Sequence, residues 1–497
     1  MIEVIKGLCT GCAACVPVCP EEAISCFGFA RINDRCADCL TCLEFCPLGA
    51  LEKKKAQREG HGQATHYDAL VIGSGMGGMS SAALLSHSGY RTLVVEKLPR
   101  IGGRCSTIEY KGVKCTTGVI GPEMGGVLEK LFEDVGAEFN VRPAGPPHYL
   151  IKGKILKMPP KGGLRTLLAS ATHDPSEVQR VMEALSKALG WSEPSKAISL
   201  RDWLLQYTRN EAILGIFQTM VSAAMLVNID ELPAQEYFLF IKKLGGYREF
   251  GYCPKGSISL PEALLKVIQQ RGGELWTHSP AKRILSKNGI VCGAIVEKDG
   301  KEVEVRASVV VSNTGPKKTV ELAGRENMDQ GYVKELEETV RPAMVICIQW
   351  MTDRPVLEGN YLLVVGARRV NAIFQPTKVC PEIAPAGKHF LLAGAAPVSS
   401  VPPLHAEKEI ELCMADLREL FPGFDQHSEI LLVSTFHGDW PGFHSWPGYG
   451  MSHKTPIVNL YNVGDGVSPS GTVALPSTVL SARLVVEDVK NRIQPTV

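Results

Sequence analysis

Eight cysteines stand in two regular runs within the first fifty residues. Each run reads C-x-x-C-x-x-C-x-x-x-C-P, the first ending at Pro20 and the second at Pro47. The cysteines are Cys9, Cys12, Cys15, Cys19, Cys36, Cys39, Cys42 and Cys46. Iron–sulfur clusters are held by Cys thiolates brought to one point, and three sulfurs at this spacing can wrap around one cubane. The fourth cysteine of each run, set off by the proline, is expected to reach the other cluster.

The two runs therefore predict two 4Fe–4S clusters with crossed ligands. One set is Cys9, Cys12, Cys15 and Cys46, and the other is Cys36, Cys39, Cys42 and Cys19. A zinc ribbon or a disulfide knot is the alternative, but zinc uses two C-x-x-C pairs and leaves half of each run without a role. Residues 1–52, which repeat with a period of about 27 residues, closely resemble bacterial two-cluster ferredoxins. The resemblance implies that the rest of the chain takes or gives single electrons.

Composition excludes some partner classes. The 497 residues suffice for several domains. The 53 basic and 52 acidic residues indicate no nucleic-acid partner. Eight further cysteines lack disulfide-like spacing, and no signal peptide precedes the first run, so a reducing cytoplasm is predicted. The most apolar window, residues 213–227, is too short to span a membrane, although peripheral membrane contact stays open.

Residues 53–66 are charged, have no apolar period and contain Gly60-His61-Gly62, so we interpret them as a linker. The lysines at 53–55 could instead dock a partner.

A dinucleotide motif follows the linker. The buried-strand run 68–72 leads directly into Gly73-Ser74-Gly75-Met76-Gly77-Gly78, and a helix rich in small residues comes next. A second strand, 92–95, ends at Glu96. Glycines at this spacing let the backbone approach a pyrophosphate at the helix N-terminus, and the acid is placed to accept ribose hydroxyls. A glycine turn without a ligand is the alternative.

The next motif indicates FAD as the nucleotide. Ile101-Gly102-Gly103-Arg104 resembles the G-G-R motif of phytoene desaturases and amine oxidases, and Leu460 to Gly466 resembles their terminal G-D motif. The sequence departs from that family at Thr116, where an aspartate is usual, and at Ser257, where a second glycine is usual. From the motif and the resemblance together we expect FAD contacts from Gly73, Gly75, Met76, Gly77, Gly78, Glu96, Lys97, Gly102, Gly103, Arg104, Ala281, Gly464, Asp465, Thr472 and Val473.

The resemblance also implies the fold. It is an α/β protein (α+β overall) with a Rossmann-like FAD-binding domain, an interleaved substrate domain and a small ferredoxin-like domain in front. Within residues 67–497 the expected FAD segments are about 67–145, 252–325 and 452–497, and the expected substrate segments are about 146–251 and 326–451. We expect residues 119–250 to be mostly helical, because apolar residues there recur at three- and four-residue spacing.

The two parts together predict a fused electron relay, in which flavin joins two-electron chemistry on a substrate to one-electron transfer through clusters. No second dinucleotide motif is present for NAD(P)H, so the expected partner is a ferredoxin or flavodoxin-like carrier. The expected reaction is saturation or desaturation of a C–C bond in an apolar small-molecule substrate. Two alternatives are an electron-transfer subunit of a larger redox complex and amine oxidase-type oxidation of C–N bonds.

No catalytic acid or base can be named from the sequence. His437 and His444 lie in an aromatic and proline-rich segment before the G-D motif, where a structural role is favoured over proton transfer. Cys105 and Cys115 lie beside motifs expected to contact flavin, and we favour a packing role over a redox role for both.

The cysteine runs and the glycine motif predict about eight iron atoms, eight acid-labile sulfides and one non-covalent FAD per chain. Iron, sulfide and flavin analysis of protein reconstituted without oxygen checks this content. Protein that holds only zinc, or only four irons, would contradict it.

Overall fold

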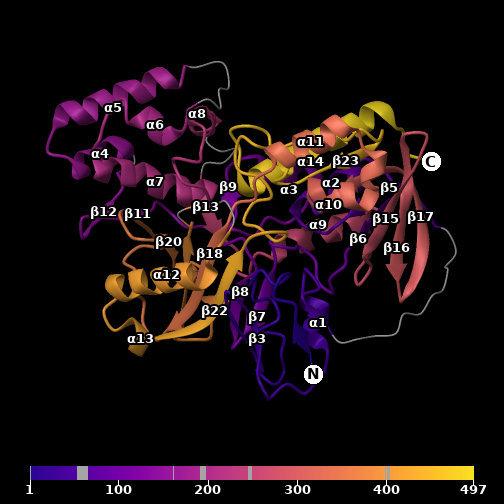
Figure 1. Ribbon diagram of the computed structural model, residues 1–497, viewed down its shortest axis with the longest axis horizontal. Coiled ribbons are helices and arrows are strands. Elements are labelled where there is room, and N and C mark those ends of the chain that lie inside the picture. The colour runs from indigo at the N-terminus through magenta and orange to yellow at the C-terminus, as the bar shows by residue number, and fades with distance from the viewer. Residues whose placement is uncertain are drawn as a thin grey trace.

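The computed structural model describes residues 2–52, 65–159, 162–190, 198–243, 249–397, 399 and 403–496. Most of the predicted linker, residues 53–64, lies outside them. Figure 1 shows three parts: a parallel-sheet domain at the upper right, a mixed-sheet domain with a helical lobe at the left, and the N-terminal module below both.

The parallel-sheet domain is built on one seven-stranded sheet. Its strand order is β14 (Glu274–Trp276), β6 (Thr92–Val95), β5 (Thr65–Ile72), β17 (Lys301–Ser312), β16 (Ile290–Lys298) and β15 (Ala281–Lys287), with β23 (Leu460–Asn462) also on β17. Strands β14, β6, β5, β17 and β23 pair in parallel, and β17, β16 and β15 form an antiparallel meander.

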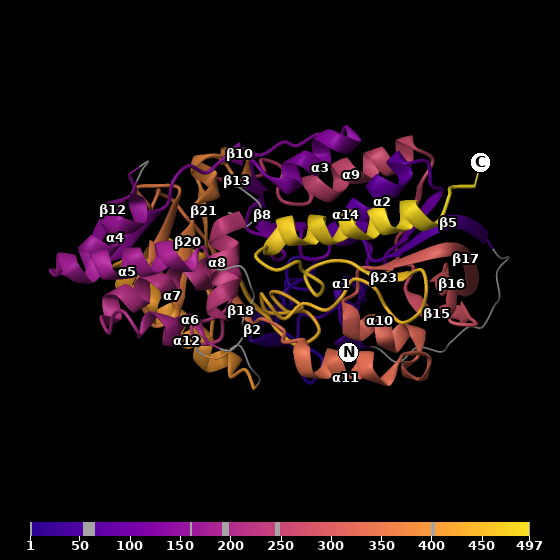
Figure 2. The ribbon, with the colours of Figure 1, turned by 90° about the horizontal axis from the view of Figure 1, so that it is seen from above.

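Helices cover both faces of this sheet. One face carries α2 (Met76–His87), α3 (Val127–Val135), α9 (Ser259–Gln270) and α14 (Ala474–Arg492), and the other α10 (Pro316–Ala323) and α11 (Gln330–Thr339). Figure 2 shows α14 lying across the domain toward the helical lobe. The apolar residues of α11, Val333 and Leu336, pack with Tyr67 and Leu70. Helix α11, which lies in the segment 326–451 expected for the substrate domain, thus contributes to the core of the parallel-sheet domain, because an amphipathic period does not reveal which domain a helix covers.

The mixed-sheet domain has the strand order β12 (Lys154–Lys157), β11 (His148–Ile151), β19 (Tyr361–Val364), β20 (Val370–Phe374), β21 (His389–Ala395), β18 (Val345–Thr352) and β22 (Ser428–Phe436). Helices α12 (Ala406–Leu420) and α13 (Phe424–His427) pack on one face. The helical lobe contains α4 (Gly163–Ala171), α5 (Pro175–Ala188), α6 (Leu200–Leu204), α7 (Glu211–Met225) and α8 (Ala234–Lys243).

The prediction of a mostly helical region at 119–250 is correct for the lobe and wrong at its edges. Strands β9 (Glu123–Met124), β10 (Arg142–Pro143), β11 and β12 lie there, and β13 (Glu249–Tyr252) pairs with β9 and β10 where the chain crosses between domains. Such short strands carry too few residues for a period to show in the sequence. Among the described residues, no helix is long and apolar enough to cross a membrane.

The N-terminal module has two antiparallel ribbons and one short helix. The ribbons are β1 (Glu3–Val4) with β4 (Leu51–Glu52) and β2 (Ile24–Phe27) with β3 (Phe29–Ile32), and the helix is α1 (Thr41–Phe45). Beside it, β7 (Thr107–Tyr110) and β8 (Val113–Thr116) form a hairpin of the parallel-sheet domain.

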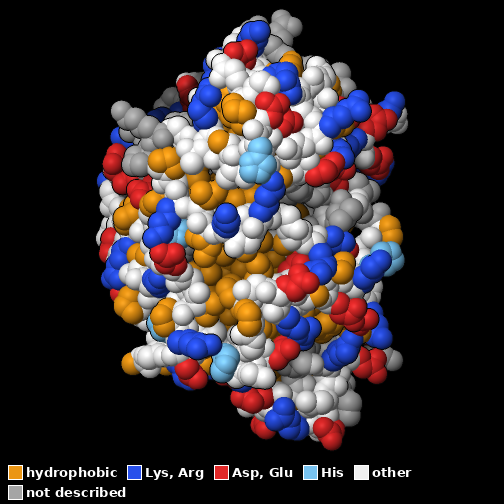
Figure 3. Space-filling model, turned by 90° about the vertical axis from the view of Figure 1, so that its left-hand side faces the viewer, with side chains coloured by type: hydrophobic (Ala, Val, Ile, Leu, Met, Phe, Trp, Pro, Cys, Tyr) orange, Lys and Arg blue, Asp and Glu red, His pale blue; other side chains and the backbone are white. Residues whose placement is uncertain are grey.

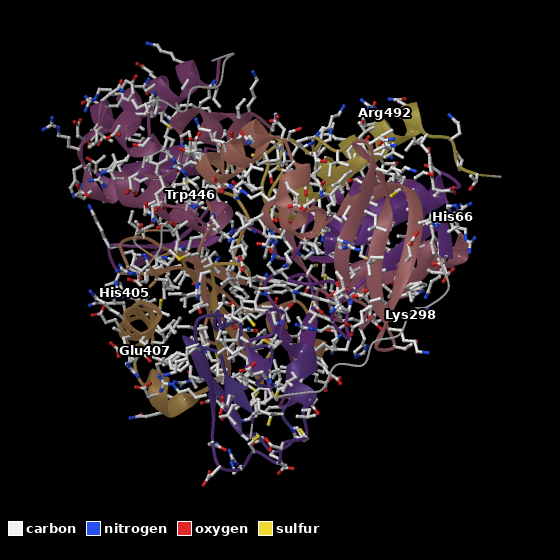
Figure 4. All side chains as sticks on the ribbon, turned by 45° about the vertical axis from the view of Figure 1, so that its right-hand side comes forward. His66, Lys298, His405, Glu407, Trp446 and Arg492 are labelled. Atoms are coloured by element: carbon white, nitrogen blue, oxygen red, sulfur yellow. The ribbon has the colours of Figure 1, made fainter. Side chains whose placement is uncertain are left out.

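The module is docked as well as tethered. The N–H of Thr435, at the end of β22, donates to the carbonyl of Gly11 at 2.8 Å, and its hydroxyl donates to the carbonyl of Thr10 at 2.5 Å. Arg31 forms an ion pair with Glu407 of α12 at 2.5 Å, and Figure 4 shows Glu407 on that helix beside the module. The sequence predicts only a linker between the module and the rest of the chain, whereas the structure also shows a direct interface between them.

Gly11→Ala is expected to loosen this interface. Gly11 has φ of 66°, and a Cβ there would lie 2.4 Å from the Thr435 hydroxyl and 2.3 Å from the carbonyl oxygen of Gly28. The left-handed conformation alone costs about 1–2 kcal/mol for a residue with a side chain. Hydrogen exchange of the Thr435 amide should become faster. Gly7→Ala is the matched control, because its Cβ would meet open space; equal exchange in both variants would contradict the role of this contact.

Candidate redox site

The glycine motif forms the turn between β5 and α2. Gly73 has φ of 94°, and a Cβ on Gly78 would lie 2.0 Å from the carbonyl oxygen of Gly73, so both positions require glycine. Helix α2 begins at Met76 with Gly75 as its N-cap, and no side chain caps its first amides. Free amides at a helix N-terminus bind phosphate. The turn therefore fits a pyrophosphate.

Glu96 closes this turn from the end of β6. Its buried carboxylate accepts hydrogen bonds from the N–H of Ser74 at 2.9 Å, the hydroxyl of Ser74 at 2.7 Å and the N–H of Leu98 at 2.9 Å. A carboxylate has about four acceptor positions, so room for a ribose hydroxyl remains. The N–H of Ser279 donates to the Glu96 carbonyl at 2.8 Å, which brings the start of β15 at Ala281 to the same edge.

The G-G-R turn packs directly on the glycine turn. The N–H of Gly102 donates to the carbonyl of Ser74 at 3.0 Å, and a Cβ on Gly103 would lie 3.7 Å from the Cα of Gly75. The ammonium of Lys97, a residue that the sequence analysis expects at the FAD site, donates to the carbonyl of Pro47 in the N-terminal module, so the lysine bridges two parts of the molecule.

Arg104, His444 and Asp465 form a buried charged cluster. The guanidinium of Arg104 contacts both oxygens of Asp465 at 2.9 and 2.8 Å, and it also donates to the carbonyls of Pro441 and Gly442. The Nδ1 atom of His444 lies 2.7 Å from Asp465 and 2.9 Å from the guanidinium. Burial alone would raise the pKa of Asp465, but Arg104 and His444 outweigh it and hold the pKa far below its usual range. His444 thus joins its segment to Asp465 and Arg104.

The end of the chain completes the site. A Cβ on Gly77 would lie 3.0 Å from the N of Gly464, so the G-D motif abuts the glycine turn. Buried Thr472 and Val473 lead into α14, which has no side-chain cap among the described residues. The side chain of Asn313 lies between these glycines, 2.4 Å from the Cβ that either Gly75 or Gly77 would carry.

The two departures from the family pattern serve contacts between segments. The backbone of Thr116 exchanges hydrogen bonds with the side-chain amide of buried Gln349 on β18, at 2.9 and 3.0 Å. The hydroxyl of Ser257 donates to the carbonyl of Ser106 at 2.9 Å. Burial raises the pKa of the Cys105 thiol well above its usual value and that of Cys115 to about 12. Both thiols therefore stay protonated and neutral, as packing residues do.

The cysteines of the N-terminal module are all free thiols, which excludes the disulfide knot. Burial raises the pKa of Cys12 to about 12, and the nearby thiols of Cys46 and Cys9 reinforce it. Burial raises the pKa of Cys42 to about 11, and the thiols that reinforce it are those of Cys19, Cys39 and Cys36. Thiols of both cysteine runs therefore lie near Cys12 and near Cys42, as crossed ligation requires, and Cys26 is a further neighbour of Cys12.

The donor atoms fit iron–sulfur chemistry. Backbone N–H groups of Ala30, Ala23 and Ala50 donate to the sulfurs of Cys9, Cys19 and Cys46 at 3.3, 3.3 and 3.1 Å, as is usual around cluster sulfurs. In the described part of the chain, no three His, Cys, Asp or Glu side chains lie close enough to hold one metal ion.

Three candidate functional residues cannot be identified from the sequence alone. Arg100 is partly buried near Cys12 and Glu96 with no hydrogen-bond partner for its guanidinium in the described residues. Asn313 fills the space above the glycine turn. Glu123 is buried, and burial raises its pKa to about 8, so it is protonated at neutral pH. None of these residues belongs to a spaced motif, and only long-range packing reveals them.

Asp465→Asn is expected to destabilise the protein by about 3–5 kcal/mol, because it leaves the Arg104 charge buried without its partner. A lowered carboxylate pKa contributes stability above the unfolded pKa near 3.9, and that stability is lost as the pH falls through the folded pKa. The loss in the variant should thus be constant between pH 5 and 8. Urea unfolding with flavin retention measures it. Asp425→Asn breaks an exposed arginine pair and should cost about 0–1 kcal/mol; an equal effect would contradict the prediction.

Comparison with known proteins agrees with this geometry. The family model for flavin-containing amine oxidoreductases matches residues 76–490, and a 4Fe–4S binding domain model matches residues 2–25. A crystal structure of an oxidoreductase from Methanosarcina mazei shares 28% identity with a TM-score of 0.75, covering 84% of this chain and all of that one.

Two curated relatives are similar to the chain over different lengths. The zeta-carotene-forming phytoene desaturase of Myxococcus xanthus is 24% identical over 84% of this chain and 93% of its own length. The human all-trans-retinol 13,14-reductase is 26% identical over 59% of this chain and 55% of its own. The predicted resemblance is confirmed: the chain belongs to the flavin-containing amine oxidoreductase family, as a FAD-dependent oxidoreductase with an N-terminal 4Fe–4S binding domain.

Proposed function

We propose that the protein passes electrons between a ferredoxin or flavodoxin-like carrier and a C–C bond of an apolar substrate, through two 4Fe–4S clusters and FAD. The observation that carries this proposal is the docking of the cysteine module beside the FAD motifs. The loop after β6 contacts the module through Lys97 and Pro47, and that loop runs directly into the G-G-R turn.

Two clusters are supported by the grouping of the eight thiols. Each set of four combines three cysteines of one run with the fourth of the other, and thiols from both runs act on Cys12 and on Cys42. Thiolates of like charge repel one another, so ionised thiols within each set need the positive charge that iron supplies.

An apolar substrate is supported by the relatives and by one face of the molecule. Figure 3 shows hydrophobic side chains gathered at the centre of the left-hand face, with charged side chains around them. On β12, Ile155 is 49% exposed. The apolar stripe of α7 faces the core, since Ile213, Phe217 and Met225 are buried. The apolar stripe of α7 therefore serves packing. The exposed hydrophobic side chains in Figure 3 are compatible with peripheral membrane contact.

Residues of this chain would bind FAD and fix the turns around it. FAD, when bound, exchanges two electrons with an organic substrate and single electrons with clusters. The cluster of Arg104, His444 and Asp465 fixes the turn at 102–104 against the segment 441–444. Saturation is the favoured direction, because a relay from a low-potential carrier supplies electrons and the human relative is a reductase by name.

Rapid mixing of the reconstituted protein with a reduced ferredoxin is expected to reduce the flavin, because the clusters deliver the electrons. NADH should reduce it far more slowly, because no second dinucleotide motif is visible. Protein loaded with FAD but not with iron is the control, and it should take carrier electrons poorly. Full-rate reduction by NADH, or by the carrier without iron, would contradict the relay.

The substrate class has a separate test. The reduced protein is incubated without oxygen with phytoene or with all-trans-retinol, and mass spectrometry should find product two mass units heavier in one of them. Turnover of amines instead would favour C–N oxidation, and turnover of no small molecule would favour an electron-transfer subunit.

A further inference from the structure

The loop 97–100, between β6 and the G-G-R turn, touches a single one of the two thiol sets. At one end, the Lys97 ammonium donates to the carbonyl of Pro47, the residue after Cys46. At the other end, the Arg100 guanidinium and the Cys12 thiol are electrostatic neighbours. Cys46 and Cys12 belong to the same crossed set. The loop therefore covers the set of Cys9, Cys12, Cys15 and Cys46, which we call the inner set.

The Arg100 guanidinium has no partner of its own. None of its three nitrogens is accessible to solvent, and none has a hydrogen-bond partner in the part of the chain that the structure describes. Its charged neighbours are Cys12 on one side and Glu96 on the other. An isolated buried charge is costly unless a negative charge lies opposite. The carboxylate of Glu96 lies on the side of the FAD motif, and a cluster bound at Cys12 would supply negative charge on the other side.

The other set, Cys36, Cys39, Cys42 and Cys19, is called the outer set. Each set has one buried thiol, Cys15 or Cys42, and the exposed Cys39 belongs to the outer set. Near the outer set, the contact of α1 with the parallel-sheet domain is a weak pair of Glu44 and His278 at 3.7 Å, with both side chains more than half exposed. The inner set is also anchored by the hydrogen bonds of Thr435 to Thr10 and Gly11, which lie between Cys9 and Cys12.

We propose that Arg100 is a positioning residue that places positive charge between the inner cluster and the FAD site, so that the inner cluster is the flavin's direct electron partner. The inference deepens the proposed function and rests on it. One electron passes from the reduced inner cluster to the flavin, the cluster loses one negative charge, and the external carrier restores that electron through the outer cluster. No bond is formed or broken in this step.

The sign of the electrostatic effect follows from the charges. Reduction adds one negative charge to the cluster, and a nearby guanidinium in a poorly solvated place stabilises that charge. Arg100 therefore raises the reduction potential of the inner cluster. Water screens a charge at the module surface, so a lysine such as exposed Lys6 should have little effect.

The test compares full-length, reconstituted Arg100→Gln with Arg100→Lys and with Lys6→Gln as the charge-matched surface control. Redox titration followed by electron paramagnetic resonance measures both clusters, and Cys12→Ser identifies the inner one. Arg100→Gln should shift the electron equilibrium of the inner cluster by about tenfold toward the oxidised form, about 59 mV for one electron. Arg100→Lys should largely restore it, and Lys6→Gln should change neither cluster.

If Arg100→Gln loses iron from the inner cluster only and Arg100→Lys retains it, this result would also support the proposed role of the positive charge at position 100. Three outcomes would overturn it: no shift, a shift of the outer cluster, or equal effects of Gln and Lys. The wild-type protein, titrated alongside, reports on the proposed function by itself. If its flavin takes no electrons from reduced clusters, the relay fails; if the relay works and Arg100 changes nothing, only this inference fails.

Discussion

The buried carboxylate of Asp465 joins segments that are far apart in the sequence. It accepts from Arg104 of the G-G-R turn and contacts His444, and Arg104 in turn binds the carbonyls of Pro441 and Gly442. Each of these groups would be costly to bury alone, and together they satisfy one another. The geometry of the FAD site, from the glycine turn to the start of α14, depends on this one set of charges.

The same segment reaches the N-terminal module. Thr435 at the end of β22 binds the loop between Cys9 and Cys12, and six residues further on Pro441 accepts from Arg104. A short stretch of chain thus spans from the inner thiol set to the charged cluster. The loop 97–100 makes a second connection, through Lys97 and Pro47. Two connections hold the module more firmly than a linker alone, which is useful because electron transfer requires a fixed separation of its partners.

The parts of the fold that the sequence predicts well are those with local chemistry. The cysteine runs, the glycine turn and the buried strand at 68–72 all rest on residues close together in the chain. The contacts that the sequence does not reveal involve partners distant in the chain. Nothing local indicates that Lys97 binds Pro47, and the sequence of α11 gives no sign of the domain that it covers. Arg100 belongs to no motif, because its neighbours Cys12 and Glu96 are brought together only by docking.

The docking contact has a consequence for how the protein is made. Thr435 and Thr10 are 425 residues apart. Ribosomes add about 5–20 residues per second, so about 20 seconds to a minute and a half passes before β22 exists to receive the module. During that time the cysteines stand uncovered by the rest of the chain, open to the machinery that delivers iron and sulfide. Cluster insertion can thus precede docking, and the later closure of β22 and the loop 97–100 would seal clusters already in place.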